Sequence, residues 1–248
     1  MKLGNIELGK IPVVVGTITG ELNVSVDSVE KVDVFEIRID MLGSTDIAYI
    51  TKILRSISVV YAKPLIVTVR SKSEGGAVDI DDDRRYEIIK AAIPSAAAID
   101  VELSSTNLLK KVSTLCKREN KLLIASYHNF KVTPEESLLD KLVLDGKSMG
   151  ADIVKLAVEA NSKEELSKLI SYTIKNKGKN IITISQGSIG ALSRIVNPII
   201  GSLMTYGYID IPSAKGQLSA FEIIEYLGLF DSMYNEKLIT RTQIMEAV

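Results

Sequence analysis

Eight short apolar segments alternate with helical segments along the 248 residues, and this alternation predicts an α/β fold, a (β/α)8 TIM barrel. Most of the segments are near-continuous apolar runs, which is typical of parallel strands covered by helices. No glycine-rich fingerprint follows the first strand, so an open doubly wound sheet is the less favoured alternative. The expected strands begin at Ile11, Val32, Pro64, Ala96, Lys121, Ala151, Asn180 and Pro198.

Turn and capping signals place the other elements. Gly4 and Asn5 in the first ten residues predict a short N-terminal hairpin ahead of the barrel. Thr133 followed by Pro134 predicts one helix start, and Asn161–Glu165 predicts another. We see no linker or repeat and expect a single barrel domain over residues 1–248.

A helix is also expected over Thr106–Cys116, with Cys116 on its apolar face as a buried side chain. The charge run Asp79–Arg85 is interpreted as acidic residues at a helix start. A metal site is the alternative, but the run lacks the alternating acids and central glycine of a calcium loop.

The composition argues against several classes of protein. The 30 basic and 31 acidic residues give a net charge of −1, which is unlike a polybasic nucleic-acid or membrane-surface binder. A single cysteine and a single histidine exclude an internal disulfide and a metal site built from several such residues. The charged N-terminus lacks a signal-peptide pattern, so we expect a soluble cytoplasmic protein.

One lysine interrupts the sixth expected strand, Ala151–Val158. Lys155 shares a strand face with Ile153 and Ala157. Lysine is rarely buried unless it is paired or functional, and desolvation favours the free amine that forms a Schiff base with a carbonyl. The structural alternative is a lysine at a strand edge that extends its charge to water.

Polar side chains also follow the other expected strands, at the end of a barrel where catalysis takes place. Glu36, Arg38 and Asp40 share one face of the second strand. Several cations around one pocket predict an anionic substrate rich in oxygens, and a lysine beside a histidine predicts carbonyl activation and proton abstraction. The remaining groups are Arg70 and Glu74, Asp100 and Glu102, His128, Gln186–Arg194 and Pro212–Gln217.

Six motifs carry a resemblance to a known family: EIRID, VTVRSKSEGG, SYHNF, DIVKLAV, ISQGSIGALSRI and PSAKGQ. From Ile11 to about Leu229 the chain resembles the type I 3-dehydroquinate dehydratases. The resemblance implies a lyase of the shikimate pathway of aromatic amino acid (chorismate) biosynthesis. It would convert 3-dehydroquinate to 3-dehydroshikimate by syn elimination, without a metal or organic cofactor, and such enzymes are often homodimers.

The resemblance also implies roles for individual residues. Lys155 would form an imine with the C3 ketone, His128 would move the proton, and Glu74 would orient His128. Glu36, Arg38 and Arg70 would hold the ring hydroxyls, Arg194 the carboxylate, and Ser213 and Gln217 would lie on a closing loop. The roles of Asp100 and Glu102 stay open. The sequence departs from relatives at Gln186, Tyr206 and Lys215, where methionine, phenylalanine and proline occur.

Two other functions fit parts of the pattern. The GSIG segment after the seventh strand is consistent with a phosphate cradle, as in another Schiff-base class I barrel aldolase acting on a sugar phosphate. The second alternative function is that of a barrel that binds a ligand but has lost catalysis. The full set of matched acid, base, nucleophile and carboxylate-binding residues disfavours it.

Overall fold

The computed structural model describes residues 1–20, 29–212, 214 and 216–246, without the side chains of 244–246. Eight parallel strands form its main sheet, in the spatial order β10-β3-β4-β5-β6-β7-β8-β9. The Leu203 N–H donates to the Ile181 carbonyl at 2.9 Å and links the two end strands, which closes the ring. The strands are β3 (Val14–Ile18), β4 (Val34–Arg38), β5 (Leu65–Thr68), β6 (Ala98–Glu102), β7 (Leu122–Asn129), β8 (Ile153–Glu159), β9 (Ile181–Gln186) and β10 (Thr205–Tyr208).

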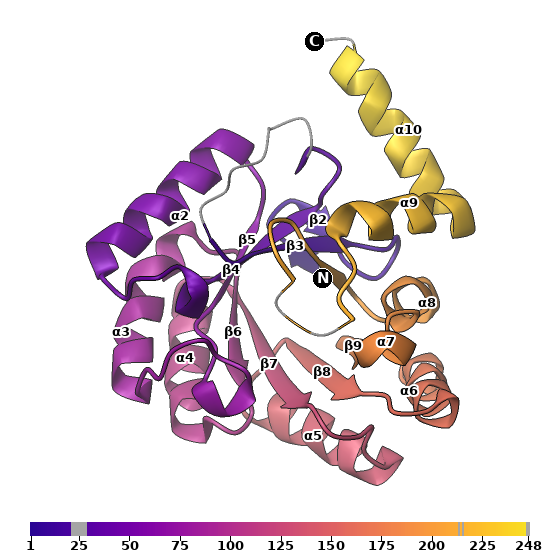
Figure 1. The fold of residues 1–248 in the computed structure, drawn as a ribbon. Helices are drawn as coiled ribbons and strands as arrows, with labels where there is room; N and C mark the ends of the chain where they lie inside the picture. Colours follow the sequence, from indigo (N-terminus) through magenta and orange to yellow (C-terminus); the bar gives the residue numbers. More distant parts are fainter. Residues whose placement is uncertain (21–28, 213, 215, 247–248) are drawn as a thin grey trace.

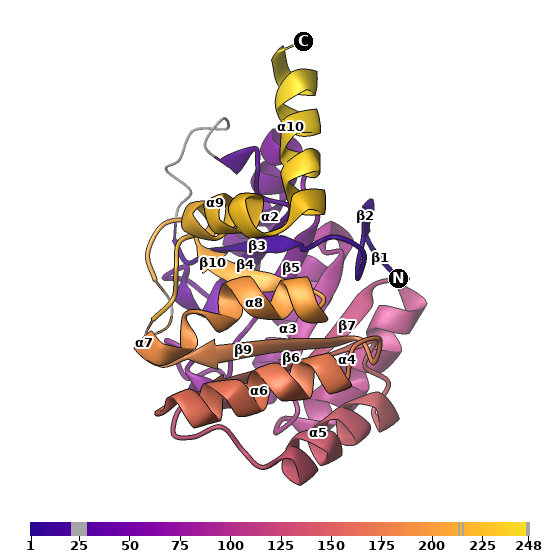
Figure 2. The same ribbon diagram turned by 90° about the vertical axis from the view of Figure 1, so that its right-hand side faces the viewer.

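Helices surround the strands (Figure 1), which confirms the predicted (β/α)8 barrel. α10 follows α9 and projects away from the barrel (Figure 2). No helix in the described part of the chain is long and apolar enough to cross a membrane. The helices are α2 (Ile47–Tyr61), α3 (Asp82–Ala92), α4 (Thr106–Arg118), α5 (Glu136–Ser148), α6 (Lys163–Lys175), α7 (Gly187–Gly190), α8 (Ser193–Ile200), α9 (Ala220–Phe230) and α10 (Ser232–Glu246), with short 3-10 turns η1 (Ile39–Met41), η2 (Lys72–Glu74) and η3 (Ile93–Ser95).

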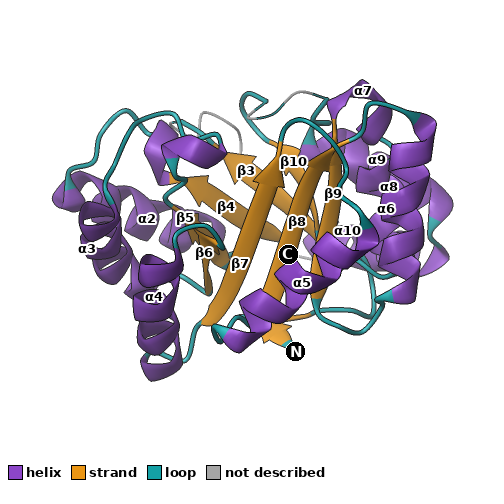
Figure 3. Ribbon diagram, turned by 90° about the horizontal axis from the view of Figure 1, so that it is seen from below, coloured by secondary structure: helices purple, strands orange, loops and turns teal. Residues whose placement is uncertain are grey.

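The predicted N-terminal hairpin is present as β1 (Lys2–Leu3) and β2 (Ile6–Glu7), which pair antiparallel. In Figure 3 the N-terminus lies at the opposite end of the barrel from the arrowheads of β7 and β8. Leu3 and Leu8 are buried in the same apolar cluster as Ile66 of the barrel interior. The hairpin therefore covers the end where the strands begin, and the site lies at the other end.

Successive side chains along β4 alternate between the helix-covered outer face of the sheet and the interior of the barrel. Phe35 and Ile37 belong to the apolar layer between the sheet and the helices, whereas Glu36 and Arg38 line a cavity inside the barrel mouth. Helix packing thus buries the apolar face and turns Glu36 and Arg38 inward, as the two-residue period predicted. Asp40, expected on the same strand face, lies beyond the strand in η1.

Most helix starts are confirmed. Asp81 caps α3 by accepting the Arg84 N–H at 2.8 Å, and Ser162 caps α6. Cys116 is buried on the inner face of α4, as expected. The start at Thr133 is wrong: α5 begins at Glu136, because the Thr133 hydroxyl donates to the Glu159 carbonyl at 2.8 Å instead of capping the helix.

The start of the eighth strand at Pro198 is also wrong, because Pro198 lies inside α8 and the strand covers only Thr205–Tyr208. A proline has no N–H, so the carbonyl four residues earlier loses its helical donor. That carbonyl belongs to Arg194, and the Thr205 hydroxyl donates to it at 2.7 Å. The substitute bond ties Arg194 to the final strand.

Candidate active site

A cavity of about 110 Å³ lies at the carboxyl ends of the strands. Of the nine site residues expected from the sequence, eight line it; Ser213, like Lys215, is outside the described residues. Gln186 and Tyr206, two of the departures from relatives, line it as well. The eight are Glu36, Arg38, Arg70, Glu74, His128, Lys155, Arg194 and Gln217.

Lys155 lies in the middle of β8, and its side chain is only 6% exposed. Its Nζ is 3.2 Å from Asp100 Oδ2 and 3.5 Å from Glu36 Oε1. On the third side, Nζ lies 4.1 Å over the centroid of the Tyr206 ring. The alternative of a strand-edge lysine that reaches water is therefore wrong, because its charge is held by two buried carboxylates.

His128 and Glu74 form a second group in the same cavity. Glu74 Oε2 accepts the His128 backbone N–H and contacts Nδ1, both at 2.9 Å. A carboxylate at Nδ1 retains the proton there and leaves Nε2 as the acceptor. Burial lowers the pKa of His128 well below its usual value, and Arg70 and Lys155 lower it further. A neutral imidazole is the form that accepts a proton.

Glu74 is held from its other side as well. The Ser104 hydroxyl donates to Oε1 at 2.5 Å. Burial raises the pKa of Glu74, while the Ser104 hydrogen bond and Arg70 oppose that rise. The carboxyl group is thus oriented by two donors that leave it facing the imidazole.

Two glycines allow this loop to approach the barrel. Gly75 has φ +90°, and a Cβ there would lie 2.9 Å from the Phe130 ring. A Cβ on Gly76 would lie 2.3 Å from the Arg70 carbonyl oxygen. Phe130 in turn stacks beside His128, with ring centroids 6.3 Å apart. The EGG segment therefore requires glycine at both positions to bring Glu74 to His128.

Asp100 and Glu102, whose roles the sequence left open, form the charged base of the cavity. Arg70 Nη1 lies 3.0 Å from Asp100 and 2.8 Å from Glu102. Burial alone would lower the pKa of Arg70, but these carboxylates raise it above its usual value. Burial likewise opposes ionisation of Asp100, yet Arg70 and Lys155 bring its pKa far below the usual range. Asp100 thus links the arginine to Lys155.

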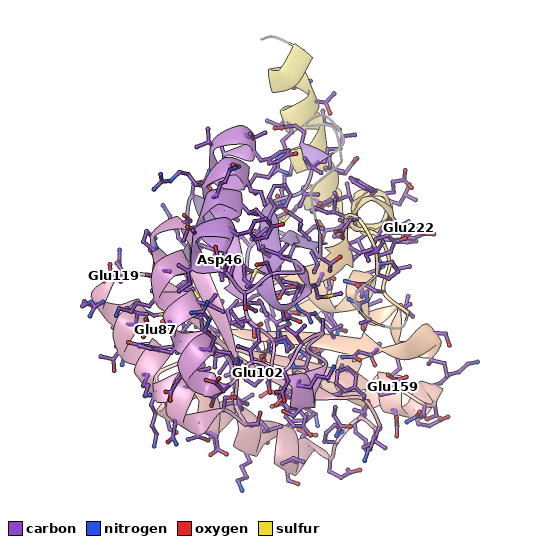
Figure 4. All side chains as sticks on the ribbon, turned by 60° about the vertical axis from the view of Figure 1, so that its left-hand side comes forward. Asp46, Glu87, Glu102, Glu119, Glu159 and Glu222 are labelled. Carbon is purple, nitrogen blue, oxygen red and sulfur yellow. The ribbon has the colours of Figure 1, made fainter. Side chains whose placement is uncertain are left out.

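Glu102 extends this network toward α3. In Figure 4 it lies in the interior, whereas Glu87 and Glu119 lie at the outer helices. Glu102 Oε2 contacts Arg85, which is itself buried and donates to the Val69 carbonyl at 2.9 Å. Glu102 therefore connects a structural arginine to Arg70, which lines the cavity.

Arg194 differs from the other cations of the cavity. Arg38 is paired with Asp40, but among the described residues no carboxylate pairs with Arg194. Its Nη1 donates to the Tyr206 carbonyl at 2.7 Å, and its Nε has no partner in the part of the chain that the structure describes. Burial lowers the pKa of Arg194 to about 10. The positive charge of this buried guanidinium is therefore the one in the cavity best suited to pair with an anionic group of a ligand.

Sequence reasoning did not assign several hydroxyls that hold the charged groups. Thr17 and Thr68 donate to the two oxygens of Glu36 at 3.1 Å and 2.9 Å. Ser126 donates to Asp100 Oδ1 at 2.6 Å. The signal was available for Ser126, because it lies two residues before His128 and so shares its strand face.

The chain matches known proteins over most of its length. The family model described as type I 3-dehydroquinase matches residues 11–233. A 3-dehydroquinate dehydratase of Hydrogenobaculum sp. is 36% identical over 202 residues, covering 80% of this chain and 88% of the relative. One of Methanocella arvoryzae is 34% identical over 218 residues, covering 88% and 96%.

Solved structures agree with the sequence comparisons. The 3-dehydroquinate dehydratase of Aquifex aeolicus has a TM-score of 0.77 at 30% identity, over 88% of this chain and 98% of that one. The type I enzyme of Clostridium difficile, solved with covalently modified comenic acid, has a TM-score of 0.83 at 25% identity, over 93% and 96%. The chain therefore belongs to the type I 3-dehydroquinase family.

Proposed function

We propose that this protein is a lyase that dehydrates 3-dehydroquinate to 3-dehydroshikimate through a Schiff base on Lys155, in aromatic amino acid biosynthesis. One observation carries the proposal: the buried Lys155 amine and the His128–Glu74 pair line the same cavity. A nucleophilic amine and a neutral base in one pocket are the two groups that an imine-assisted elimination needs.

The first step joins the substrate to the enzyme. The Lys155 amine, after losing a proton, adds to the C3 carbonyl carbon, and loss of one water gives a protonated imine. Asp100 at 3.2 Å and Glu36 at 3.5 Å from Nζ stabilise the positive charge that stays on this nitrogen. The imine is the electron sink, so the proposed mechanism requires no further cofactor.

The second step is the elimination. His128 takes the C2 proton, and the C–H electrons move toward the imine nitrogen to form an enamine. The enamine then expels the C1 hydroxyl, which leaves as water with the proton that His128 returns. Hydrolysis of the conjugated imine regenerates Lys155 and releases the enone, so the overall change is the loss of one water. The lowered pKa of His128 keeps the base unprotonated near neutral pH.

The charges around the cavity fit this substrate. Arg194, which has no acidic partner among the described residues, is assigned to the carboxylate. Arg38 and Arg70 are already paired with carboxylates, so they suit neutral ring hydroxyls better than a second anion. Gln217 lines the cavity from the loop after β10 and is assigned to the same substrate. Ser213 stays a prediction, as do a cytoplasmic location and a homodimer.

The sugar-phosphate aldolase is less well supported. The GSIG segment is a four-residue turn, α7, and a Cβ on Gly187 would lie 2.4 Å from Glu159 Oε1. That carboxylate repels a phosphate dianion at the start of the turn. Among the described residues that line the cavity, Arg194 is the one arginine without an acidic partner, and one such arginine matches a carboxylate better than a phosphate dianion.

Incubation with 3-dehydroquinate tests the proposal. We expect the absorbance of a conjugated enone to appear, and borohydride added during turnover to inactivate the enzyme by adding mass to Lys155. Lys155→Met should abolish both signals. Lys237→Met is the matched control, because Lys237 also pairs with a carboxylate, Asp33 at 2.8 Å, and lies 4.6 Å over the Tyr234 ring, outside the cavity. Enone formation by Lys155→Met at the wild-type rate would refute the proposal.

A further inference from the structure

The hydroxyl of Tyr206 has no assigned task. Tyr206 is 3% exposed, and its hydroxyl oxygen has no hydrogen-bond partner among the described residues. Lys155 Nζ lies 4.1 Å from the centroid of the same ring, so the hydroxyl belongs to a side chain that contacts the reacting amine. A buried hydroxyl without a partner destabilises the folded state, so its position beside the reacting amine requires an explanation.

The acceptors around Lys155 are nearly all occupied in the ligand-free protein. Glu36 receives the hydroxyls of Thr17 and Thr68, and Asp100 Oδ1 receives the Ser126 hydroxyl and lies 3.0 Å from Arg70 Nη1. Asp100 Oδ2 and Glu36 Oε1 also share the Lys155 ammonium. Within the described ranges, Nζ is the donor that reaches Asp100 Oδ2.

Imine formation changes the number of donors at this point. A lysine ammonium carries three N–H groups, which is enough for both carboxylates. A protonated imine carries one N–H, because the other two hydrogens are lost as the C=N bond forms. One of the two contacts to Asp100 and Glu36 must therefore be lost. Glu36 Oε1 keeps the Thr68 hydroxyl, whereas Asp100 Oδ2 has no other donor among the described residues, so the loss is costly at Asp100.

We propose that the Tyr206 hydroxyl is a reserve donor, which hydrogen-bonds to the Glu36–Asp100 carboxylate pair when Lys155 becomes an imine. Tyr206 is then a positioning residue, and this inference rests on the proposed Schiff-base function. In the free enzyme the hydroxyl has no described hydrogen-bond partner, and in the intermediate it donates to a carboxylate. It therefore stabilises the imine intermediate relative to the free enzyme.

The surroundings of the hydroxyl support this role. Burial raises the pKa of Tyr206 well above its usual value, and the charges of Glu36 and Asp100 raise it further. The hydroxyl therefore lies in the field of the carboxylates that it would serve and stays protonated as a donor. A phenylalanine would supply the same ring face to the cation but could not donate a hydrogen bond.

Tyr206→Phe removes this one oxygen, and Tyr234→Phe is the matched control. Tyr234 is also fully buried, its hydroxyl also lacks a partner among the described residues, and its ring also faces a lysine, Lys237. Both variants, and the wild type, are titrated with 3-dehydroquinate and trapped with borohydride. Intact mass then gives the substrate concentration at half-maximal adduct, and thermal unfolding gives the ligand-free Tm.

We expect Tyr206→Phe to raise the half-saturating concentration roughly tenfold or more, the size of a lost hydrogen bond to a charged group. Its ligand-free Tm should stay at or above the wild-type value, because an idle buried hydroxyl has been removed. Tyr234→Phe should leave the half-saturating concentration unchanged.

Two results overturn the inference: an unchanged half-saturating concentration in Tyr206→Phe, or a loss of adduct that is matched by a lower ligand-free Tm. The second result would indicate a structural role for the hydroxyl. Absence of any adduct in the wild type while enone forms would instead refute the Schiff-base function itself, so the two failures are distinguishable.

Discussion

Replacing Arg194 by methionine should stabilise the ligand-free protein and at the same time remove its recognition of the substrate carboxylate. The guanidinium is buried, and among the described residues its Nε has no hydrogen-bond partner and no carboxylate compensates its charge. Methionine keeps most of the apolar contact of the arginine stem and removes the buried charge. Folding stability should rise while substrate affinity falls, because the negative charge that compensates Arg194 is supplied by the ligand and is missing from the ligand-free protein.

The structure sets the size of the stabilisation. Burial lowers the pKa of Arg194 from 12.5 to about 10. A difference of that size corresponds to about 3 kcal/mol of lost stability. The folded-state pKa lies below the unfolded value, so this penalty is present in full at neutral pH and is relieved only as the pH rises above about 10.

Part of the gain is offset, because the hydrogen bond from Arg194 to the Tyr206 carbonyl contributes about 1 kcal/mol. The net stabilisation is about 2 kcal/mol. For a chain of this size we expect a rise in Tm of about 4–8 °C.

Thermal unfolding with and without the substrate, or with its dehydration product, measures both effects. The wild-type Tm should rise with ligand, and the Tm of Arg194→Met should start higher and respond little. Arg194→Lys is the control: it keeps a buried cation and should show no gain in ligand-free Tm, and it should recover only part of the binding because it lacks the planar fork. A lower ligand-free Tm in Arg194→Met, together with wild-type affinity, would show that the buried charge is not a carboxylate site.

Three further outcomes are expected. His128→Ala should retain the imine adduct on Lys155 but lose roughly 10²–10⁴-fold in turnover, whereas Glu74→Gln should lose less because the base survives. Intact mass measures the adduct, and enone formation measures turnover. An equal loss of turnover in the two variants would contradict the assignment of His128 as the base. The single imidazole should titrate below pH 6.5 in NMR, since burial lowers the pKa of His128. Folding stability should decline as the pH falls from 6.5 toward that lowered pKa, because the unfolded state binds the proton first, and kcat/KM should decline as the pH falls through the lowered pKa. An imidazole that titrates at or above 6.5 would contradict the burial argument. Gly75→Ala should destabilise the protein by about 1 kcal/mol or more and reduce activity, because the new Cβ meets Phe130 at a φ of +90°; unchanged denaturant midpoint and activity would contradict the packing argument.

Local periodicity was enough to predict the barrel and the inward position of several charged residues, whereas the roles of the site residues came from the family resemblance. Alternation along β4 assigned Glu36 and Arg38 to the interior because a strand turns successive side chains to opposite faces. Lys155 was conspicuous because a lysine in an apolar strand is rare. These are short-range properties, which is why they can be read from neighbouring residues.

Short-range signals failed where a distant group competes for the same atoms. Thr133 has the sequence of a helix cap, but the Glu159 carbonyl, which lies 26 residues away along the chain, takes its hydroxyl. Pro198 reads as the start of a strand, but Thr205 satisfies the carbonyl that the proline leaves free, so the helix continues through it. Neither partner is visible in the local pattern.

The sequence by itself determined which residues carry charge and which strand face Glu36, Arg38 and Lys155 occupy. Only the tertiary structure decided how those charges are shared: Asp100 between Arg70 and Lys155, Glu102 between Arg70 and Arg85, and Arg194 with no described carboxylate. The reason is physical. Closing the ring brings side chains from strands far apart in the chain within about 3 Å of each other, and at that distance the burial and charge of neighbours set each pKa.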